Sequence, residues 1–302
     1  MVLKAGAIAS GCVAIGDVDE SAQHLYDSAI SAGRHGLMTW MERNGDIRRS
    51  PALLLEGAKT MVCTAFPFSP SGKHPFISDY ALPREDYHQA IRRKLSEAGD
   101  EIVRLYGGSY RISIDSAPVR ERYWAVKSGI ASQCLNNCVA VPDAGTEVFL
   151  AELLLTLSLK NYGANFAGTA ALPQCTRCGL CVKHCPTGAL KPDGSCDMSR
   201  CLSYLTVEYR GEELPSFAKA MKKAVGCDIC REVCPLNFIE NIRFKAPEWL
   251  SPSPEIYDLT LSEMADIQPS DFRRRFGASA ISRLKPSMLR RNARLLLGDT
   301  DN

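Results

Sequence analysis

Apolar residues recur with two different spacings along the first 165 residues, and the spacings predict both strands and helices. Short apolar runs at 59–66, 110–114 and about 138–141 predict buried strands. Apolar residues three or four positions apart, from Tyr87 through Leu95 to Leu105, predict an amphipathic helix after Asp86. Helices are also predicted at 123–129 and 148–157, and as short stretches among the small residues of 1–60. Strands alternating with helices indicate an α/β domain.

Asp115 follows the strand predicted at 110–114 and opens the sequence Asp-Ser-Ala-Pro. Asp or Ser followed by Pro is typical of a helix start, so Asp115 could simply cap the helix that comes next. An acid at a strand end that faces a cavity could instead have its pKa raised by burial and act as a general acid. These residues by themselves favour the cap.

Cysteine dominates the later part of the chain, where nine of the thirteen cysteines lie between residues 175 and 234. The first run, C-x2-C-x2-C-x3-C-P, begins at Cys175 and ends at Pro186, and a second run ends at Cys234 and Pro235. This is the spacing of bacterial ferredoxins, in which the fourth cysteine of a run binds the other cluster. The sequence therefore predicts two [4Fe-4S] clusters.

The crossing rule assigns four cysteines to each cluster and leaves Cys196 as a small buried hydrophobe. Structural zinc is the alternative, but it would leave the third cysteine of the first run and the Cys-Pro unused. The predicted ligands of cluster 1 are Cys175, Cys178, Cys181 and Cys234, and those of cluster 2 are Cys185, Cys201, Cys227 and Cys230.

Composition and missing motifs narrow the chemistry further. The net charge of +2 indicates no particular partner, no apolar run reaches the length of a membrane span, and the N-terminus lacks a signal pattern. Thirteen cysteines in such a chain favour a reducing compartment, so we expect a cytoplasmic protein. No glycine-rich dinucleotide or P-loop motif is present. Two clusters in one small domain form an electron wire, which implies a cofactor or substrate elsewhere that receives electrons.

Residues 164–172, rich in Gly, Ala and Thr, are interpreted as a linker. This linker leads from an N-terminal domain (1–165) into a ferredoxin-like double-cluster domain (166–245). A short basic helical tail (246–302) follows. Between 271 and 294 the tail has eight Lys or Arg and one acidic residue, interleaved with apolar positions. The sequence leaves open whether this surface binds phosphate or is a solvated basic face.

Several segments outside the cysteine runs resemble the epoxyqueuosine reductases, cobalamin-dependent iron–sulfur enzymes that complete queuosine at the wobble position of tRNA. The resemblance extends from about residue 33 to residue 298. The distinctive combination is D-S-A-P at 115–118 with S-Y-L-T-V-E at 203–208. Other matching segments are G-R-H-G-L-M-T-W-M (33–41), Y-A-L-P-R-E-D-Y-H (80–88), V-F-L-A-E-L (148–153) and G-C-D-I-C-R-E-V-C-P-L-N (226–237).

The resemblance implies a base-off cobalamin held between the N-terminal domain and the clusters, and an epoxide whose oxygen leaves as water. It implies Asp115 as the proton donor, a tRNA substrate and a low-potential electron donor, and we expect a monomer with no membrane association. Arg48 and His88 could equally be surface residues, and Tyr87 could be core. The residues that would border the cofactor and substrate cavity are Arg48, Tyr80, Tyr87, His88, Asp115, Leu135, Asn136 and Ser203.

Two departures from the family pattern bear on this prediction. Leu135 stands where the family usually has a lysine, in a segment that commonly reads G-[FW]-x-G-K-N. A cation there could contact a propionamide, a phosphate or the substrate, so its absence bears on cofactor affinity or substrate identity. Longer family members also have C-terminal helical repeats that help to hold tRNA, so the basic tail of this chain is expected to contribute more of that binding.

Three functions follow from the sequence. The leading hypothesis is reduction of epoxyqueuosine in tRNA. A second is a corrinoid-dependent reductase of another substrate, which would bind cobalamin but leave epoxyqueuosine unchanged. The third is an electron-transfer iron–sulfur protein without cobalamin, in which the loss of Asp115 would leave electron transfer intact.

Overall fold

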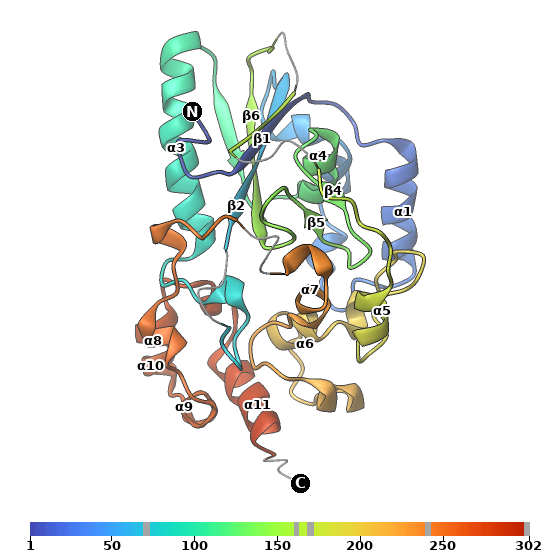
Figure 1. The fold of residues 1–302 in the computed structure, drawn as a ribbon, viewed down its shortest axis with the longest axis vertical. Helices are drawn as coiled ribbons and strands as arrows, with labels where there is room; N and C mark the ends of the chain where they lie inside the picture. The colour runs from blue at the N-terminus through green and yellow to red at the C-terminus, as the bar shows by residue number, and fades with distance from the viewer. Residues whose placement is uncertain (69–72, 160–162, 168–171, 239–242, 299–302) are drawn as a thin grey trace.

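A five-stranded antiparallel sheet lies at the centre of the N-terminal part of the protein (Figure 1). The computed structural model describes residues 1–68, 73–159, 163–167, 172–238 and 243–298. The strand order is β3-β6-β2-β1-β7. The strands are β1 (Ala9–Ala14), β2 (Thr60–Pro67), β3 (Tyr110–Ser113), β6 (Val148–Leu155) and β7 (Ala164–Phe166).

Helices cover both faces of this sheet (Figure 1). Helix α3 (Tyr87–Tyr106) packs Ile91 and Leu95 against one face, and the Asp86 side chain caps it by accepting the His88 backbone N–H. Helix α4 (Glu121–Lys127) and the hairpin of β4 (Ser132–Gln133) and β5 (Val139–Ala140) cover the other face, with α1 (Glu20–Ser31) outside them. Strands β2 and β3 and helices α3 and α4 match the elements predicted at these places.

The helix predicted at 148–157 is wrong, because this segment forms β6, the strand between β2 and β3. Leucine, alanine and glutamate favour a helix in isolation. Here residues 149, 151 and 153 face α3, while 148, 150 and 154 face α4, so both faces of the strand are covered. A strand buried on both faces is a continuous apolar run, which sequence periodicity does not separate from a buried helix.

Other differences from the prediction lie in the small-residue segments. Strand β1 was not predicted within 1–60, and β7 lies inside the predicted linker, of which residues 168–171 fall outside the described part. Strand β5 belongs to a separate two-stranded hairpin rather than to the main sheet. Sheet and helices are both present, as predicted, but every strand pair that the structure describes is antiparallel. The division into three domains stays a prediction.

Short helices follow the cysteines of the cluster segment. They are α5 (Leu180–His184), α6 (Leu202–Val207) and α7 (Ile229–Glu232), and a further short helix, α2 (Gly45–Arg49), lies near the N-terminus. Single turns of 3₁₀ helix occur at Thr39–Met41, Pro51–Leu54, Asp79–Ala81, Met198–Arg200, Ser216–Ala220, Pro235–Asn237, Glu248–Leu250 and Ala280–Arg283.

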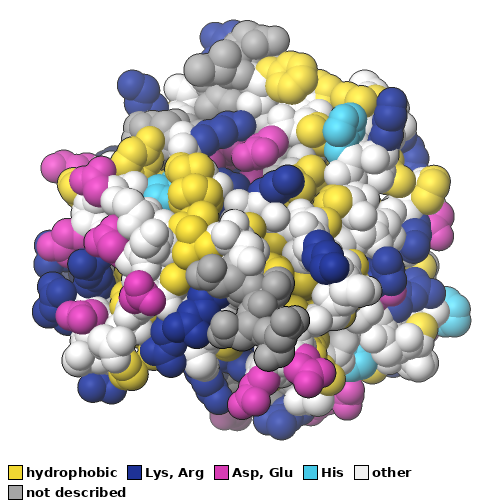
Figure 2. Space-filling model, turned by 90° about the horizontal axis from the view of Figure 1, so that it is seen from below, with side chains coloured by type: hydrophobic (Ala, Val, Ile, Leu, Met, Phe, Trp, Pro, Cys, Tyr) yellow, Lys and Arg dark blue, Asp and Glu magenta, His cyan; other side chains and the backbone are white. Residues whose placement is uncertain are grey.

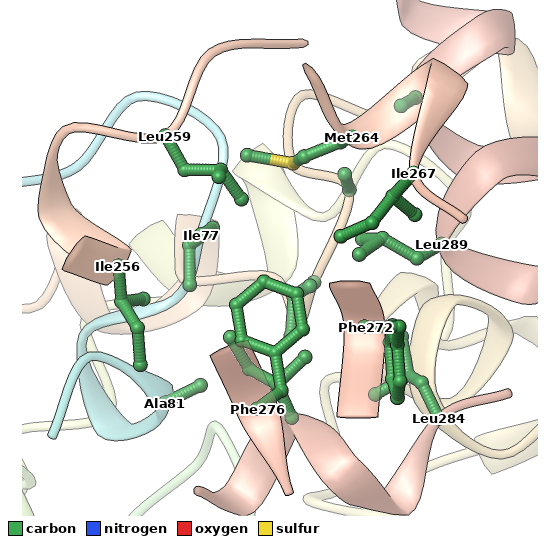
Figure 3. Packing of buried hydrophobic residues seen from close by; sticks show 14 of the residues in the cluster. Ile77, Ala81, Ile256, Leu259, Met264, Ile267, Phe272, Phe276, Leu284 and Leu289 are labelled. Carbon is green, nitrogen blue, oxygen red and sulfur yellow. The ribbon is translucent and has the colours of Figure 1, made fainter. Parts of the chain in front are cut away.

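The C-terminal segment is packed into the protein. Its helices, α8 (Pro254–Tyr257), α9 (Leu261–Asp266), α10 (Pro269–Phe276) and α11 (Pro286–Leu297), enclose a hydrophobic core together with Ile77 and Ala81 from the loop before α3 (Figure 3). Phe272 and Phe276 of α10 lie inside this core. Among the described residues no helix is both long enough and apolar enough to cross a membrane.

Several basic residues of this segment bind other parts of the protein. Arg291 donates to the carbonyl oxygens of Leu205, Tyr209 and Gly211, and Arg290 donates to that of Ile267 at 2.9 Å. On the face seen in Figure 2, Lys and Arg side chains are interleaved with Asp and Glu and form no continuous patch. Part of the predicted basic surface is therefore structural.

Candidate functional site

Asp115 lies at the end of β3, where its backbone has a left-handed φ of 44°. Its backbone N–H donates to the Glu121 carboxylate at the start of α4. The capping position of α4 is Arg120, so the interpretation of Asp115 as a helix cap is wrong. The Asp115 carboxylate instead accepts hydrogen bonds from α3, from the Tyr87 hydroxyl at 2.8 Å and from His88 Nε2 at 3.0 Å.

His88 links Asp115 to a second carboxylate. Its Nδ1 lies 2.6 Å from Oδ1 of Asp86, so the imidazole bridges two acids. Burial acts to lower the pKa of His88, but the hydrogen bonds to Asp115 and Asp86 outweigh it and raise the pKa to about 9. Burial acts in the opposite direction on Asp115, whose pKa is nevertheless lowered by the hydrogen bond and charge of His88 and by the Tyr87 hydroxyl.

The resting site therefore holds an ion pair, with a proton on His88 and a negative charge on Asp115. The Asp115 side chain is 49% exposed, so one side of the carboxylate is open to an incoming molecule. Excluding water from this side would disfavour both charges, and the proton would then move from His88 to Asp115. This arrangement can deliver one proton to an oxygen atom bound beside Asp115.

Aromatic stacking fixes the donor side of this arrangement. The Tyr87 ring stacks on Phe149 of β6 with centroids 4.0 Å apart and planes 9° apart, and on His88 at 4.1 Å. The Tyr87 and His88 side chains project from the first turn of α3, which Asp86 caps. The position of the imidazole is thus set by helix, sheet and cap together.

Two further segments border Asp115. Tyr80 lies against Gly226, which precedes Cys227 in the cluster segment, and burial raises the pKa of its hydroxyl. Gly226 has a φ of 76°, and a Cβ there would meet Ser78 at 2.4 Å, so only glycine fits. Arg283 of the C-terminal segment pairs with Glu208 and helps to hold the pKa of Asp115 low. The acid therefore lies where three parts of the chain meet.

Two glutamates behind Asp115 were not predicted from the sequence. Burial, followed by the charge of Asp115, raises the pKa of Glu121 to about 8. Glu152 is wholly buried on β6, opposite Cys63 on β2 and Ser113 on β3. Burial and the neighbouring Glu121 raise the pKa of Glu152 well above its ordinary value and so favour its neutral form. The sequence signal that could have revealed Glu152 is the presence of a glutamate in an otherwise apolar run.

The four cysteines predicted for cluster 1 line one small cavity. Its opposite wall is the hairpin segment Cys134, Leu135 and Asn136, so two predicted cofactor contacts, Leu135 and Asn136, lie at this cavity. The Leu135 side chain is buried and packs with Cys181 and Leu190. The cavity-lining cysteines are Cys175, Cys178, Cys181 and Cys234.

The cysteines predicted for cluster 2 also lie together. Cys201 interacts electrostatically with Cys185, Cys227 and Cys230, and the backbone N–H groups of Ser203 and Tyr204 point to its sulfur. Such N–H groups stabilise thiolates, and similar donors surround Cys185. Cysteine thiolates with amide donors are typical ligands of iron–sulfur clusters. Ser203 therefore lies beside the ligand group of cluster 2.

Two predicted residues lie apart from these groups. Arg48 is buried near the N-terminus, where it donates to the carbonyl oxygens of Arg43 and Trp40, both at 3.3 Å. Cys196 is half-buried, with its sulfur 3.4 Å from that of Met198. The predicted role of Arg48 at the cofactor stays a prediction.

Comparison with known proteins bears on these sites. A family model described as a 4Fe-4S double cluster binding domain matches residues 174–237, and one described as "Epoxyqueuosine reductase QueG, DUF1730" matches residues 48–116. An epoxyqueuosine reductase from Gloeobacter violaceus is 33% identical over 301 residues, covering 93% of this chain and 88% of the relative. The chain belongs to the epoxyqueuosine reductase family.

Solved structures of epoxyqueuosine reductases have the same fold. One, in complex with a tRNA-Tyr epoxyqueuosine-modified stem loop, is 27% identical, with a TM-score of 0.84 over 99% of this chain and 79% of that chain. Another, from Bacillus subtilis, is 26% identical with a TM-score of 0.82 at the same coverage, and is described with its catalytic aspartate loop swung out of the active site.

The double-cluster family model decides between iron–sulfur clusters and structural zinc for the cysteines. The double-cluster family model covers all eight predicted ligands, so the segment is an iron–sulfur domain rather than a zinc site. The protein is accordingly an oxidoreductase of the epoxyqueuosine reductase family.

Proposed function

We propose that this protein reduces epoxyqueuosine to queuosine in tRNA, using cobalamin and electrons from two [4Fe-4S] clusters. The observation that carries the proposal is the chain of hydrogen bonds from Asp86 through His88 to Asp115, which ends at an open carboxylate near the cluster segment. Relatives named for this activity and one structure with a modified tRNA stem loop support the choice of substrate.

The proposed cluster ligands are the two cysteine groups of the structure. Cluster 1 is assigned to Cys175, Cys178, Cys181 and Cys234, and cluster 2 to Cys185, Cys201, Cys227 and Cys230. All-cysteine ligation suits low-potential one-electron transfer, so a low-potential donor is proposed as the electron source. We also propose a monomer acting in the cytoplasm, where reducing conditions keep thiols available to iron.

Cobalamin is proposed to bind beside Asp115. The Asp115 carboxylate is open on one side, and Tyr80 lies against Gly226, next to Cys227. Tyr80, Tyr87 and His88 are proposed to hold cobalamin on this side. When bound and reduced, cobalamin supplies a cobalt nucleophile for the epoxide carbon.

The protein's own residues manage the protons. Converting an epoxide to an alkene and water consumes two electrons and two protons. His88 stores one proton at rest, and Asp115 transfers it to the epoxide oxygen once bound substrate excludes water. Tyr87 holds the Asp115 carboxylate in position through its hydroxyl. Asp115 and His88 then take up a second proton from solvent and pass it to the resulting hydroxyl, which leaves as water. A further proton from solvent restores the resting pair.

Anaerobic reconstitution tests the proposal. Protein loaded with iron, sulfide and cobalamin is incubated with tRNA that contains epoxyqueuosine, and the nucleosides are analysed by mass spectrometry. Wild type is expected to remove one oxygen atom. Asp115→Asn is expected to lose about two orders of magnitude in rate or more while still binding cobalamin. Asp17→Asn, at an exposed carboxylate, is the matched control.

Other outcomes separate the alternatives. Cobalamin binding with an unchanged nucleoside would favour a corrinoid reductase of another substrate. Failure to bind cobalamin, with both clusters present, would favour an electron-transfer protein.

A further inference from the structure

The hairpin of β4 and β5 carries two cysteines that the proposed function does not use. Its turn is closed by a hydrogen bond of 2.9 Å from the Cys134 N–H to the Cys138 carbonyl oxygen, with Asn137 at a φ of 62°. The hairpin belongs to the N-terminal part of the chain but reaches the cluster segment, because Asn136 donates to the Cys230 carbonyl oxygen at 3.3 Å.

Cys134 faces the cavity of cluster 1. It is 4% exposed and lines this cavity together with the four proposed ligands. Its sulfur interacts electrostatically with Cys175 and lies 3.8 Å from the Ser132 carbonyl oxygen. Leu135 lines the same wall, where it packs with Cys181 and Leu190. Cys134 is therefore a fifth thiol beside a cluster that takes four.

Cys138 lies near the other ligand group. It lies close enough to Cys230 and Cys201 to interact with their charges. Its backbone N–H donates to Oδ1 of Asn136 at 3.1 Å, and the same side chain donates to Cys230. The Asn136 amide thus fixes the position of Cys138 relative to this ligand group.

We propose that the two hairpin thiols tune the two clusters separately, Cys134 acting on cluster 1 and Cys138 on cluster 2. A thiol S–H is a weak hydrogen-bond donor, and donors that face cluster sulfurs stabilise the reduced, more negative state. Each thiol therefore raises the reduction potential of its own cluster. The inference rests on the proposed ligand assignment.

Redox titration of the reconstituted holoprotein, followed by electron paramagnetic resonance, tests this inference. Cys134→Ala is expected to lower the potential of cluster 1 and leave cluster 2 unchanged, and Cys138→Ala to do the reverse. Cys134→Ser and Cys138→Ser keep a donor and are expected to retain more of the wild-type value than the alanine variants. Cys12→Ala, on β1 within the sheet, is the matched control, with no expected change.

Iron analysis separates failure of the inference from failure of the ligand assignment. All variants are expected to bind about eight irons per chain. Unchanged potentials with full iron in both alanine variants would overturn the tuning role alone. Loss of about four irons from Cys134→Ala would make Cys134 a ligand and overturn both the inference and the assignment.

Discussion

In the resting site, protonated His88 is the source of the proton that Asp115 donates. Asp86 and Asp115 hold the imidazole between two carboxylates, and together they favour the protonated ring over the neutral one. Asp115 alone would be a poor donor at neutral pH, because its own pKa is lowered. Proton donation is thus a property of the pair, and Tyr87 keeps the pair aligned.

The pH dependence of stability reports this ion pair. The pKa of His88 rises from its ordinary value near 6.5 to about 9 on folding. Its stabilising contribution is therefore complete below about pH 6.5 and is lost as the pH rises through about 9. Urea unfolding of wild type and His88→Gln across pH 6 to 10 should show a stability difference that shrinks over this window. A constant difference would mean that His88 is neutral at rest.

Strand β6 shows what an element can hide from sequence analysis. Its apolar residues face α3 and α4 alternately, and it places Glu152 between the sheet and α4. The glutamate is wholly buried, and burial favours its neutral form. A buried ionisable residue on a central strand makes the folded protein less stable than a neutral residue would at the same position.

Replacing Glu152 by Gln is expected to stabilise the protein at neutral pH. The folded pKa of Glu152 lies well above that of the unfolded chain, so the unfolded state gains stability by ionising as pH rises above about 4.3. The gain of Glu152→Gln over wild type should be present at pH 7 to 8 and shrink toward pH 4. Denaturant unfolding at several pH values measures it. A gain that is independent of pH would contradict the titration of Glu152.

Helix α11 stabilises the cluster segment through direct hydrogen bonds. The Asn292 side chain is fully buried and donates to the carbonyl oxygens of Thr206 at 3.0 Å and Ala224 at 2.8 Å. These carbonyl groups flank the segments that carry Cys201 and Cys227. The helix therefore holds both segments in place.

Asn292→Ala would leave two buried carbonyl oxygens unsatisfied. The expected loss is about 2–4 kcal/mol of unfolding free energy, together with iron lost preferentially from cluster 2. Thermal unfolding and iron analysis measure the two effects. Arg273→Ala, at an exposed position in α10, is the control and should change neither.

The sequence predicted features that depend on residues close together along the chain better than contacts between residues far apart along it. The cysteine spacing could be interpreted because it involves residues close together in the sequence. The cysteines predicted for each cluster lie near one another in the structure. The α3 periodicity was equally local. The contact of Asp115 with Tyr87 and His88 joins residues 27 or 28 positions apart, so only the family resemblance placed them near one site. Strand β1 has small residues and little apolar pattern, and nothing local revealed its pairing with β2.

At the scale of the whole molecule, the acid lies at the meeting point of the N-terminal sheet, the cluster segment and the C-terminal helices. Arg283 pairs with Glu208 and faces Asp115, so the C-terminal segment completes the border of the site. The exposed basic residues that remain for tRNA are fewer than the sequence indicated, and they include Arg273, Arg274 and Lys285.

Removing these three charges should weaken tRNA binding without affecting the chemistry. Each phosphate contact with single-stranded nucleic acid contributes about 0.7 to the slope of log affinity against log salt. Arg273→Ala, Arg274→Ala and Lys285→Ala combined should reduce that slope by about 2, with the rate at saturating tRNA unchanged. Binding titrations at several salt concentrations measure this. An unchanged slope would place the tRNA surface elsewhere.

The bonds from Asn292 also bear on how the protein is made. Thr206 and Ala224 lie 86 and 68 residues before Asn292, so during translation both cluster 2 segments leave the ribosome long before the residue that holds them. Cluster 2 should therefore enter a stable site only after synthesis has passed residue 292. Until then both segments lack this support, so a delivery system that hands over iron and sulfur after residue 292 has been made would suit this architecture better than one that acts earlier on the nascent chain.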